Sequence, residues 1–454
     1  YLPLGLELIG RYLARKQGCS VAKLWERLQA QKLAAKALLE AETGMTASLG
    51  VTAAFELSWQ ELNEEAKQLA ALLSLFALAE NPWSLVQQCL PEADEEKLEY
   101  LRDRQFVNAS LLSFEGGENY QLHQLLREFF GVKREQQPDI DAIKKSLCRV
   151  MGNTGRHIPQ TVTLDVIKQV IPVISHLQET AIALNTWLSN DDLIACCHGV
   201  ACFHAGRFAF SAAETWYQFC QSLIEQRLGK NHLFVTATLN DLAGLYYLQG
   251  QYSAAELLYL KSLEIRQQQL GRNHLYVATS LNNLAGCYQS QGRYSVSELL
   301  YLESLEIRQQ QLGQDHLDVG VCLNNLAVLY ELQGQYSKAE PLHLKAIDIL
   351  QKQLGENHPD VAKGLNGLGY LYFRQGRYAE AEPLYLKSRD IWQWYLGLDH
   401  PLVATSLSNL ADLYQSQGRY QEAESLYRQA LNINQQHLGQ SHPNVASDLN
   451  GLAV

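Results

Sequence analysis

The sequence of 454 residues is notable first for what it lacks. No apolar run approaches the roughly 18 uninterrupted residues of a membrane span, and the N-terminus lacks the basic-then-apolar pattern of a secretion signal. The nine cysteines show no even, spaced framework of the kind that staples small secreted domains. We therefore expect a cytoplasmic protein with buried free thiols and no membrane partner.

Basic charge is also in short supply. Lys and Arg together number 37 against 48 Asp and Glu, a formal net charge of -11. Phosphate backbones are bound by basic surfaces, so nucleic acid is not expected to be the main partner.

A phosphate-cradling G-x-x-x-x-G-K-(S/T) loop is absent as well. Without its backbone amides and lysine, the chain is expected to hold no cofactor of its own and to hydrolyse no ATP. No Ser-His-Asp or Cys-His arrangement is supported either, so we expect no catalytic residues and no enzyme activity.

What the sequence does contain is a long internal repeat. Six histidines stand 42 residues apart, and the surrounding residues recur with them: His232, His274, His316, His358, His400 and His442. Each unit places apolar residues at three- and four-residue steps in two stretches, which is typical of two amphipathic helices. A glycine such as Gly334 lies between the stretches, where a left-handed turn joins the helices. The sequence thus predicts stacked antiparallel helix pairs.

The motifs L-N-N-L-A-x-L-Y, Q-G-x-Y and A-E-x-L-Y resemble the tetratricopeptide repeat, most closely its kinesin light chain variety. The resemblance implies an all-α, right-handed helical solenoid over residues 191–454. We expect a degenerate first repeat at 191–231, five repeats at 232–441 and a partial repeat at 442–454. In the degenerate repeat, A-G-R-F at 205–208 matches Q-G-x-Y, followed by a two-residue insertion. The resemblance implies that a protein or peptide ligand binds in the groove.

Asparagines recur inside each first helix, although Asn is a poor residue in helix interiors. One interpretation is a ladder of hydrogen bonds between repeats. The other is that the second Asn of each pair faces the groove and holds the backbone of an extended peptide. The resemblance assigns this peptide-binding role to Asn283, Asn325 and Asn409.

Two other polar groups favour structural interpretations. Each periodic histidine follows Asn, Asp or Ser at a helix start, where we expect a capping role. Cys196, Cys197, His198, Cys202 and His204 crowd one segment, but the paired C-x-x-C spacing of structural zinc sites is missing, so no metal site is expected.

The N-terminal part follows another pattern. Helical patterns at 51–62, 64–78, 82–90 and 94–105 precede a hairpin with its turn at 115–118 and a last helix at 123–134. That order predicts a winged-helix domain at 46–135. Residues 136–190, apolar helical pieces broken by prolines, are expected to form a helical connector.

Y-L-P-L-G-L-E-L at 1–8 and Q-L-H-Q-L-L-R-E-F-F at 121–130 resemble motifs of the NB-ARC class of signalling NTPases. The resemblance implies that residues 1–45 end a helical subdomain, that Pro3 lies against adenine, and that His123 contacts the β-phosphate of ADP. The family's Gly is either replaced by Tyr1 or lies upstream of it, and Gln124 stands in place of the family's Asp. ADP or ATP would be bound by the full-length parent.

These features together favour the sensor region of a nucleotide-switched signalling ATPase. Since the chain begins at Tyr1 and stops inside a repeat at Val454, we expect a fragment whose parent carries an upstream nucleotide-binding domain and can oligomerise. Two alternatives stay open: a kinesin light chain type adaptor without switching, and the sensor part of an NB-ARC transcriptional regulator.

Overall fold

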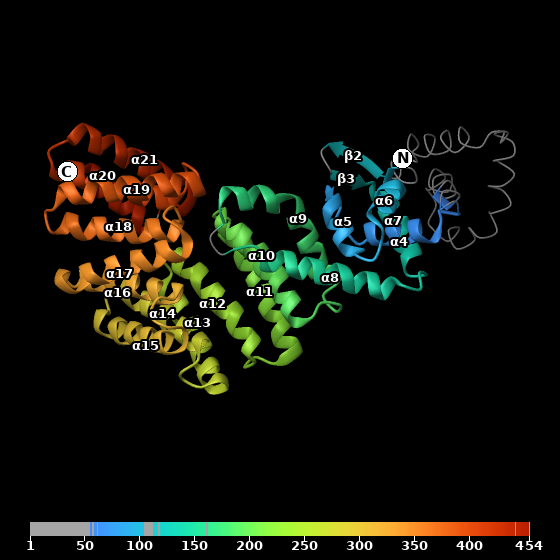
Figure 1. Cartoon of the computed structure of the whole chain (residues 1–454), viewed down its shortest axis with the longest axis horizontal. Coiled ribbons are helices and arrows are strands. Elements are labelled where there is room, and N and C mark those ends of the chain that lie inside the picture. The colour runs from blue at the N-terminus through green and yellow to red at the C-terminus, as the bar shows by residue number, and fades with distance from the viewer. Residues whose placement is uncertain are drawn as a thin grey trace. The chain divides into compact units, whose positions relative to one another are not determined.

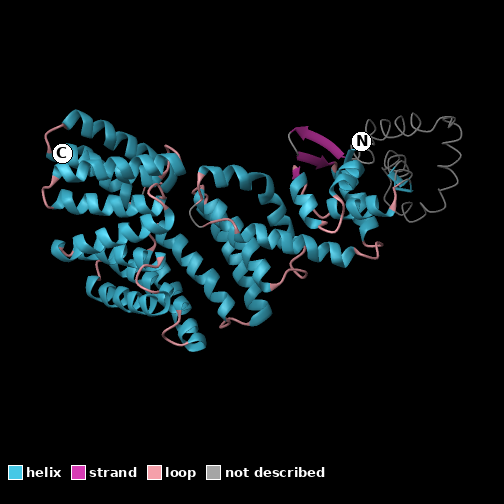
Figure 2. Cartoon of the chain, in the orientation of Figure 1, coloured by secondary structure: helices cyan, strands magenta, loops and turns pink. Residues whose placement is uncertain are grey.

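The computed structural model describes residues 55–56, 59–60, 62–103, 112–116, 119–159, 162–440 and 442–453. Pro3 and the subdomain expected at 1–45 lie outside the described residues. The chain divides into two compact units: an N-terminal unit, Tyr1–His157 with Gln169–Gly199, and a solenoid unit, Ile158–Lys168 with Val200–Val454. Helices dominate both units (Figures 1 and 2). None of the described helices is long and apolar enough to cross a bilayer.

The N-terminal unit combines short helices with a small antiparallel sheet. Its strands, in the order β1-β3-β2, are β1 (Asn81–Pro82), β2 (Leu112–Gly116) and β3 (Asn119–Leu122). The expected hairpin is formed by β2 and β3, with an irregularity between Phe114 and Gly116. Its helices are α4 (Glu64–Leu73), α5 (Trp83–Cys89), α6 (Glu95–Tyr100), α7 (Gln124–Arg134) and α8 (Ile140–Arg156).

Two longer helices, α9 (Leu164–Ala183) and α10 (Asn190–Gly206), each run across the division between the units. The proline pattern predicted a break in the first of them, but Pro172 lies inside α9. Proline removes one backbone donor and disfavours the helical turn before it, yet the apolar residues on either side continue the helical pattern. Packing of that face therefore outweighs the local preference.

The solenoid unit consists of helix pairs. Its first helices are α12 (Leu233–Leu248), α14 (Leu275–Ser290), α16 (Leu317–Leu332), α18 (Pro359–Arg374), α20 (Pro401–Ser416) and α22 (Pro443–Ala453). Its second helices are α11 (Phe210–Leu228), α13 (Tyr252–Leu270), α15 (Tyr294–Leu312), α17 (Tyr336–Leu354), α19 (Tyr378–Leu396) and α21 (Tyr420–Leu438). Helix α10 pairs with α11 in the degenerate repeat.

The turn within each pair depends on one left-handed residue. Gly250 has φ +74, and its amide donates to the Tyr247 carbonyl at 3.0 Å, which ends α12. Glycine adopts this conformation without the steric penalty of a Cβ. The same geometry recurs at the other four turn glycines, with φ between +73 and +77.

The degenerate repeat corrects the expected alignment. The left-handed turn position is occupied by Phe208, with φ +58, and not by Gly206, which ends α10. The 42-residue register therefore continues from Phe208 to Gly250, and the two-residue insertion was wrong. Gly206 is needed for another reason, since a Cβ there would lie 2.6 Å from Cβ of Val162.

Within the pairs, a buried tyrosine on the second helix packs against a small residue on the first. Ala285 is buried near Tyr301, and a Cβ on Gly369 would lie only 3.0 Å from the Tyr385 ring. Small residues thus let the helices approach closely. The cysteines of the described residues are free and buried. Burial raises the pKa of Cys287 to about 12 and that of Cys322 to about 11.

Enlarging a small core position should test this packing. Ala327, fully buried on α16, has no space for an indole, so Ala327→Trp should destabilise the solenoid by roughly 1–3 kcal/mol or more. Chemical denaturation measures the loss. Ala379→Trp, at an exposed position of α19, is the matched control and should change stability by less than about 0.5 kcal/mol. Equal stability of both variants would contradict the placement of Ala327.

Candidate functional site

The first helices form the inner layer of the solenoid. Consecutive first helices, such as α14 and α16 or α16 and α18, contact one another more extensively than consecutive second helices do. Such a difference bends the stack toward the first helices, which then line its concave side. The solvent-exposed stripe of each first helix therefore faces the groove.

The three predicted peptide-binding asparagines lie at equivalent positions on this inner layer and are half-buried. Asn325 donates to Oδ1 of Asn282 at 3.2 Å, and Asn409 donates to Oδ1 of Asn366 at 3.1 Å. Asn283 accepts from Nδ2 of Asn282 at 3.3 Å. The ladder of hydrogen bonds between repeats thus exists at two of the three positions.

The ladder leaves part of each amide unused. Among the described residues, the Oδ1 atoms of Asn325 and Asn409 and the Nδ2 atom of Asn283 have no hydrogen-bond partner in the protein. An amide carries both donors and acceptors, as a peptide backbone does. The geometry is therefore compatible with peptide binding, which stays a prediction.

The asparagine series is interrupted at Gly367, and the structure supplies the reason. His343 replaces the tyrosine that other second helices carry, and its buried ring occupies the adjacent space. A Cβ on Gly367 would lie 2.7 Å from Cε1 of His343. His343 Nδ1 lies 3.1 Å from Oδ1 of Asn324, and Nε2 lies 3.5 Å from the buried Glu331 carboxylate. A buried polar cluster thus excludes Asn from position 367.

Sequence reasoning missed a cation on the same face. Lys363 lies one helical turn before Gly367 on α18, where the equivalent residues are Thr279, Val321 and Thr405. Its side chain reaches solvent, yet the surrounding protein lowers the pKa of its amine through loss of hydration. An exposed side chain whose amine is partly dehydrated fits a position on a concave wall. The sequence could have indicated this cation, because a lysine stands where the equivalent repeats have Thr or Val.

The periodic histidines have the predicted capping role. In each first helix, Nδ1 of the histidine accepts from the backbone amide two residues later, at 3.1 or 3.2 Å, as His316 does from Asp318. These rings fix where each helix begins. In the part of the chain that the structure describes, no three His, Cys, Asp or Glu side chains are grouped to hold a metal ion.

In the N-terminal unit, His123 is the exposed N-cap of α7. Its Nδ1 accepts from the Leu125 amide at 3.2 Å. In the neutral ring the proton must then be on Nε2, which makes that atom a donor directed away from the cap. An exposed ring with this donor is compatible with the predicted contact to an anion.

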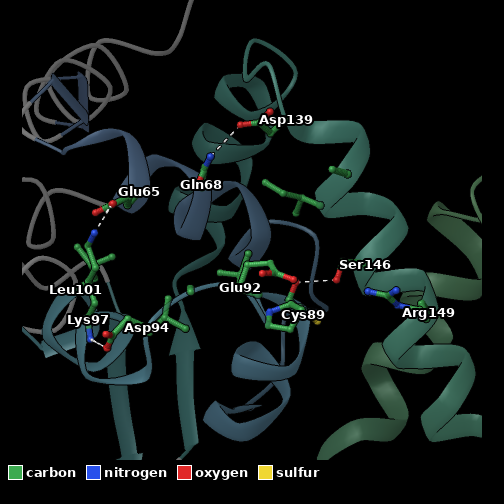
Figure 3. A pocket seen from close by; sticks show the side chains of 16 residues that line it. Glu65, Gln68, Cys89, Glu92, Asp94, Lys97, Leu101, Asp139, Ser146 and Arg149 are labelled. Atoms are coloured by element: carbon green, nitrogen blue, oxygen red, sulfur yellow. Dashed lines mark hydrogen bonds and ion pairs between the residues drawn. The ribbon is translucent and has the colours of Figure 1, made fainter.

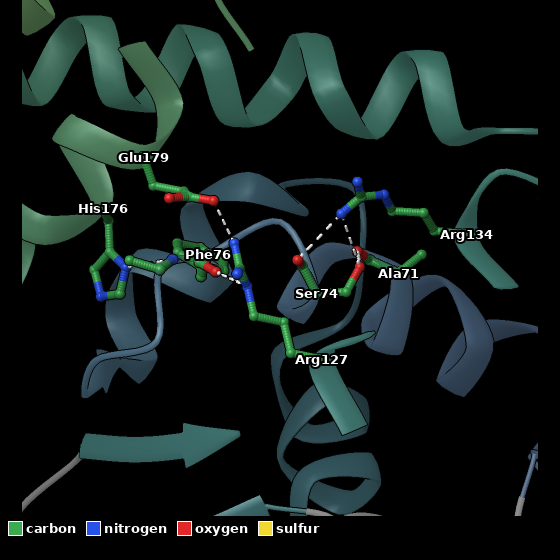
Figure 4. Close-up of polar contacts among 8 residues, drawn as sticks. Ala71, Ser74, Phe76, Arg127, Arg134, His176 and Glu179 are labelled. Atoms are coloured by element: carbon green, nitrogen blue, oxygen red, sulfur yellow. Dashed lines mark hydrogen bonds and ion pairs between the residues drawn. The ribbon is translucent and has the colours of Figure 1, made fainter. Parts of the chain in front are cut away.

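Polar contacts fix α7 against its neighbours (Figure 4). Arg127, one turn after His123, donates through Nε to the Phe76 carbonyl at 2.7 Å and forms an ion pair with Glu179. Arg134 donates to the Ser74 carbonyl at 3.1 Å. Both arginines bind backbone carbonyls near the end of α4, so they hold the helix that carries His123.

His176 completes this region as a buried, neutral ring. Its Nδ1 accepts from the Ala77 amide at 3.1 Å, and its Nε2 donates to the Glu80 carbonyl at 2.8 Å. Burial lowers the pKa of His176, and the charge of Arg127 lowers it further, although Glu80 and Glu179 oppose the shift. Protonation at Nδ1 would break the bond to Ala77.

A cavity of about 610 Å³ lies between α4, α8 and the α5–α6 connection (Figure 3). Four carboxylates line it, those of Glu65, Glu92, Asp94 and Asp139, against the cations of Lys97 and Arg149. Lys97 is already paired with Glu65, and Gln68 donates to Asp139 at 3.0 Å. An excess of carboxylates disfavours phosphate, so this cavity is poorly suited to a nucleotide.

Comparison with known proteins identifies the repeats. The tetratricopeptide repeat model matches residues 193–268, 258–310, 276–352 and 360–436, more than half of the chain. No curated protein is similar enough to count as a match.

Several solved structures are similar. BtubC from P. vanneervenii is 24% identical, with a TM-score of 0.39, over 52% of this chain and 92% of that one. A kinesin light chain-like repeat protein from Podospora anserina is 27% identical, with a TM-score of 0.36, over 45% and 97%. A STAND ATPase with a tetratricopeptide repeat sensor from Pyrococcus horikoshii is 16% identical, with a TM-score of 0.46, over 91% and 62%. Since all three TM-scores are below 0.5, the family assignment depends on the repeat match.

The neutral state of His176 predicts a pH dependence. Because its pKa is lowered in the folded state, the unfolded chain binds the proton more readily once the pH falls below the ordinary value of 6.5. Stability of the N-terminal unit should therefore decrease from about pH 6.5 downward. Replacing His176 by Gln should reduce that slope by up to about 1.4 kcal/mol per pH unit. Denaturation of both proteins across this range measures it, and an unchanged slope would contradict the assignment.

Proposed function

This chain belongs to the tetratricopeptide repeat family, and on that premise we propose that its solenoid is the ligand-sensing part of a nucleotide-switched signalling ATPase. The ligand is a protein segment or peptide bound in extended form along the inner face. The observation that carries the proposal is the line of partly unsatisfied amides at Asn283, Asn325 and Asn409.

These amides favour the backbone of a peptide over its side chains. Each pairs with the backbone of an extended segment through one donor and one acceptor, as a neighbouring β-strand would. The hydrogen bonds to Asn282 and Asn366 hold two of the side chains in place before the ligand arrives. A held side chain loses less conformational entropy on binding, which favours affinity.

The switching role is supported by the N-terminal unit. His123 directs an Nε2 donor into solvent from the start of α7, and Arg127 and Arg134 fix that helix. In the parent, His123 contacts the β-phosphate of ADP and stabilises the resting state. The ligand then activates the protein by binding the active state more tightly than the resting state, because only such a difference in affinity shifts the equilibrium. In a plain adaptor, His123 would serve only as the N-cap of α7.

Removing the groove amides should weaken peptide binding. Each of Asn283→Ala, Asn325→Ala and Asn409→Ala should cost about 1 kcal/mol, a roughly fivefold weaker Kd, as for one neutral hydrogen bond. The probe is a fluorescent peptide selected from a random library for binding to the unmutated chain. Fluorescence anisotropy measures its Kd.

Asn432→Ala, at an exposed position of the second helix α21, is the matched control and should bind the peptide as tightly as the unmutated chain does. Because the affinity depends on neutral groups, it should change little between low and physiological ionic strength. A collapse of binding over that range would indicate a charge clamp and reject the amide model.

The role of His123 can be tested in the full-length parent. His123→Ala removes both the phosphate contact and the N-cap, so His123→Ser, which keeps a cap, is the informative variant. Losing a charge-assisted hydrogen bond of about 1.5–3 kcal/mol should speed ADP release about ten- to a hundredfold and raise basal signalling. Stopped-flow release of a fluorescent ADP measures the rate. Equal rates in His123→Ser and the parent would exclude the sensor role.

A further inference from the structure

The turn between α10 and α11 is closed by a residue that is unfavourable there. Phe208 has φ +58, and among the described residues it is the non-glycine residue with a left-handed backbone. Its backbone repeats the glycine turns, since its amide donates to Ala205 and the Ala209 amide donates to His204, both at 2.9 Å. A bulky side chain is disfavoured in this conformation, and such strain persists only where other contacts hold it.

Two rings from the far end of the solenoid hold Phe208. Its ring centroid lies 5.2 Å from that of His400, which begins α20, and 4.8 Å from that of His437, in the last turn of α21. Both separations fall within the roughly 4.5–7 Å that aromatic pairs prefer, and the ring planes are tilted by 61° and 54°. The degenerate first repeat thus contacts the fifth full repeat.

Other contacts join the same two ends of the solenoid. His442 Nε2 lies 3.3 Å from the Leu248 carbonyl, 194 residues away in sequence. A Cβ on Gly250 would lie 3.6 Å from Cδ of Pro443, and one on Gly397 would lie 3.3 Å from Cδ1 of Leu164. The chain therefore returns on itself after one turn of the superhelix.

We propose that Phe208, held between His400 and His437, is a clasp that closes this turn around the inner groove and must release before a peptide enters. The proposal rests on the groove being the binding site. Glycine serves at the five equivalent turns, so the phenylalanine is explained by what its ring contacts and not by the turn itself. Release breaks the two ring contacts and leaves the hydrogen bonds of the turn in place, so the closed and open forms stay close in free energy.

Photo-cross-linking tests the contact directly. With p-benzoylphenylalanine at position 208 of the full chain, illumination should join the label to peptides that contain His400 or His437. The same label at Phe219, which lies against Trp216 in its own helix, is the control and should react within the degenerate repeat. Products from position 208 confined to that repeat would refute the clasp.

Phe208→Gly tests the gate, because glycine suits the turn and removes the ring. Association of the library-selected fluorescent peptide should become about three- to tenfold faster, since the apparent association rate constant scales with the fraction of open molecules. The matched control is Phe234→Ala, which removes a ring 5.2 Å from His232 within one repeat and should leave the rate unchanged. An unchanged rate in Phe208→Gly rejects the gate. If the unmutated chain binds no peptide from the library, the proposal of a binding groove fails. The cross-link then still decides whether Phe208 contacts His400 and His437.

Discussion

Two backbone turns that suit glycine set the geometry of the whole solenoid. The turn within a pair has φ near +75, and the turn between pairs, as at Gly271, combines φ +80 with ψ 163. These turns limit the first helices to 16 residues and the second helices to 19, as in α12 and α13. Because the two helices of every pair have the same lengths as in the next pair, side chains 42 residues apart lie at equivalent positions on the inner face. The line of groove amides is a consequence of that regularity.

The period, the helix pairs and the capping histidines could be predicted because they follow from local spacing. What could not be predicted depends on residues distant in sequence. The ring of Phe208 is held by His400, and the small strand β1 exists because Asn81 pairs with Tyr120. The alignment of A-G-R-F failed for a related reason, since Gly206 is required by Val162 and not by the turn.

In the candidate site, too, local spacing predicted part of the geometry, and contacts between residues distant in sequence determined the rest. Equivalent positions predicted where the amides stand, but the hydrogen bond from Asn325 to Asn282 depends on how adjacent repeats are stacked. The exclusion of Asn at Gly367 by the ring of His343 requires packing that no periodicity reveals. In the N-terminal unit, the exposure of His123 likewise follows from its position at the start of α7. The recognition proposed for the groove amides and the anion contact proposed for His123 would therefore be separate chemical tasks on separate units.

The buried cysteines have a practical consequence for how opening of the solenoid can be followed. Cys220, Cys287 and Cys322 lie in α11, α14 and α16, which belong to different repeats. A thiolate is the reactive species, and burial keeps Cys287 and Cys322 protonated and shielded while their repeats are closed. Alkylation of each thiol therefore requires local unfolding around it. Mass spectrometry of a timed alkylation would rank the repeats by the order in which they open, without any added label.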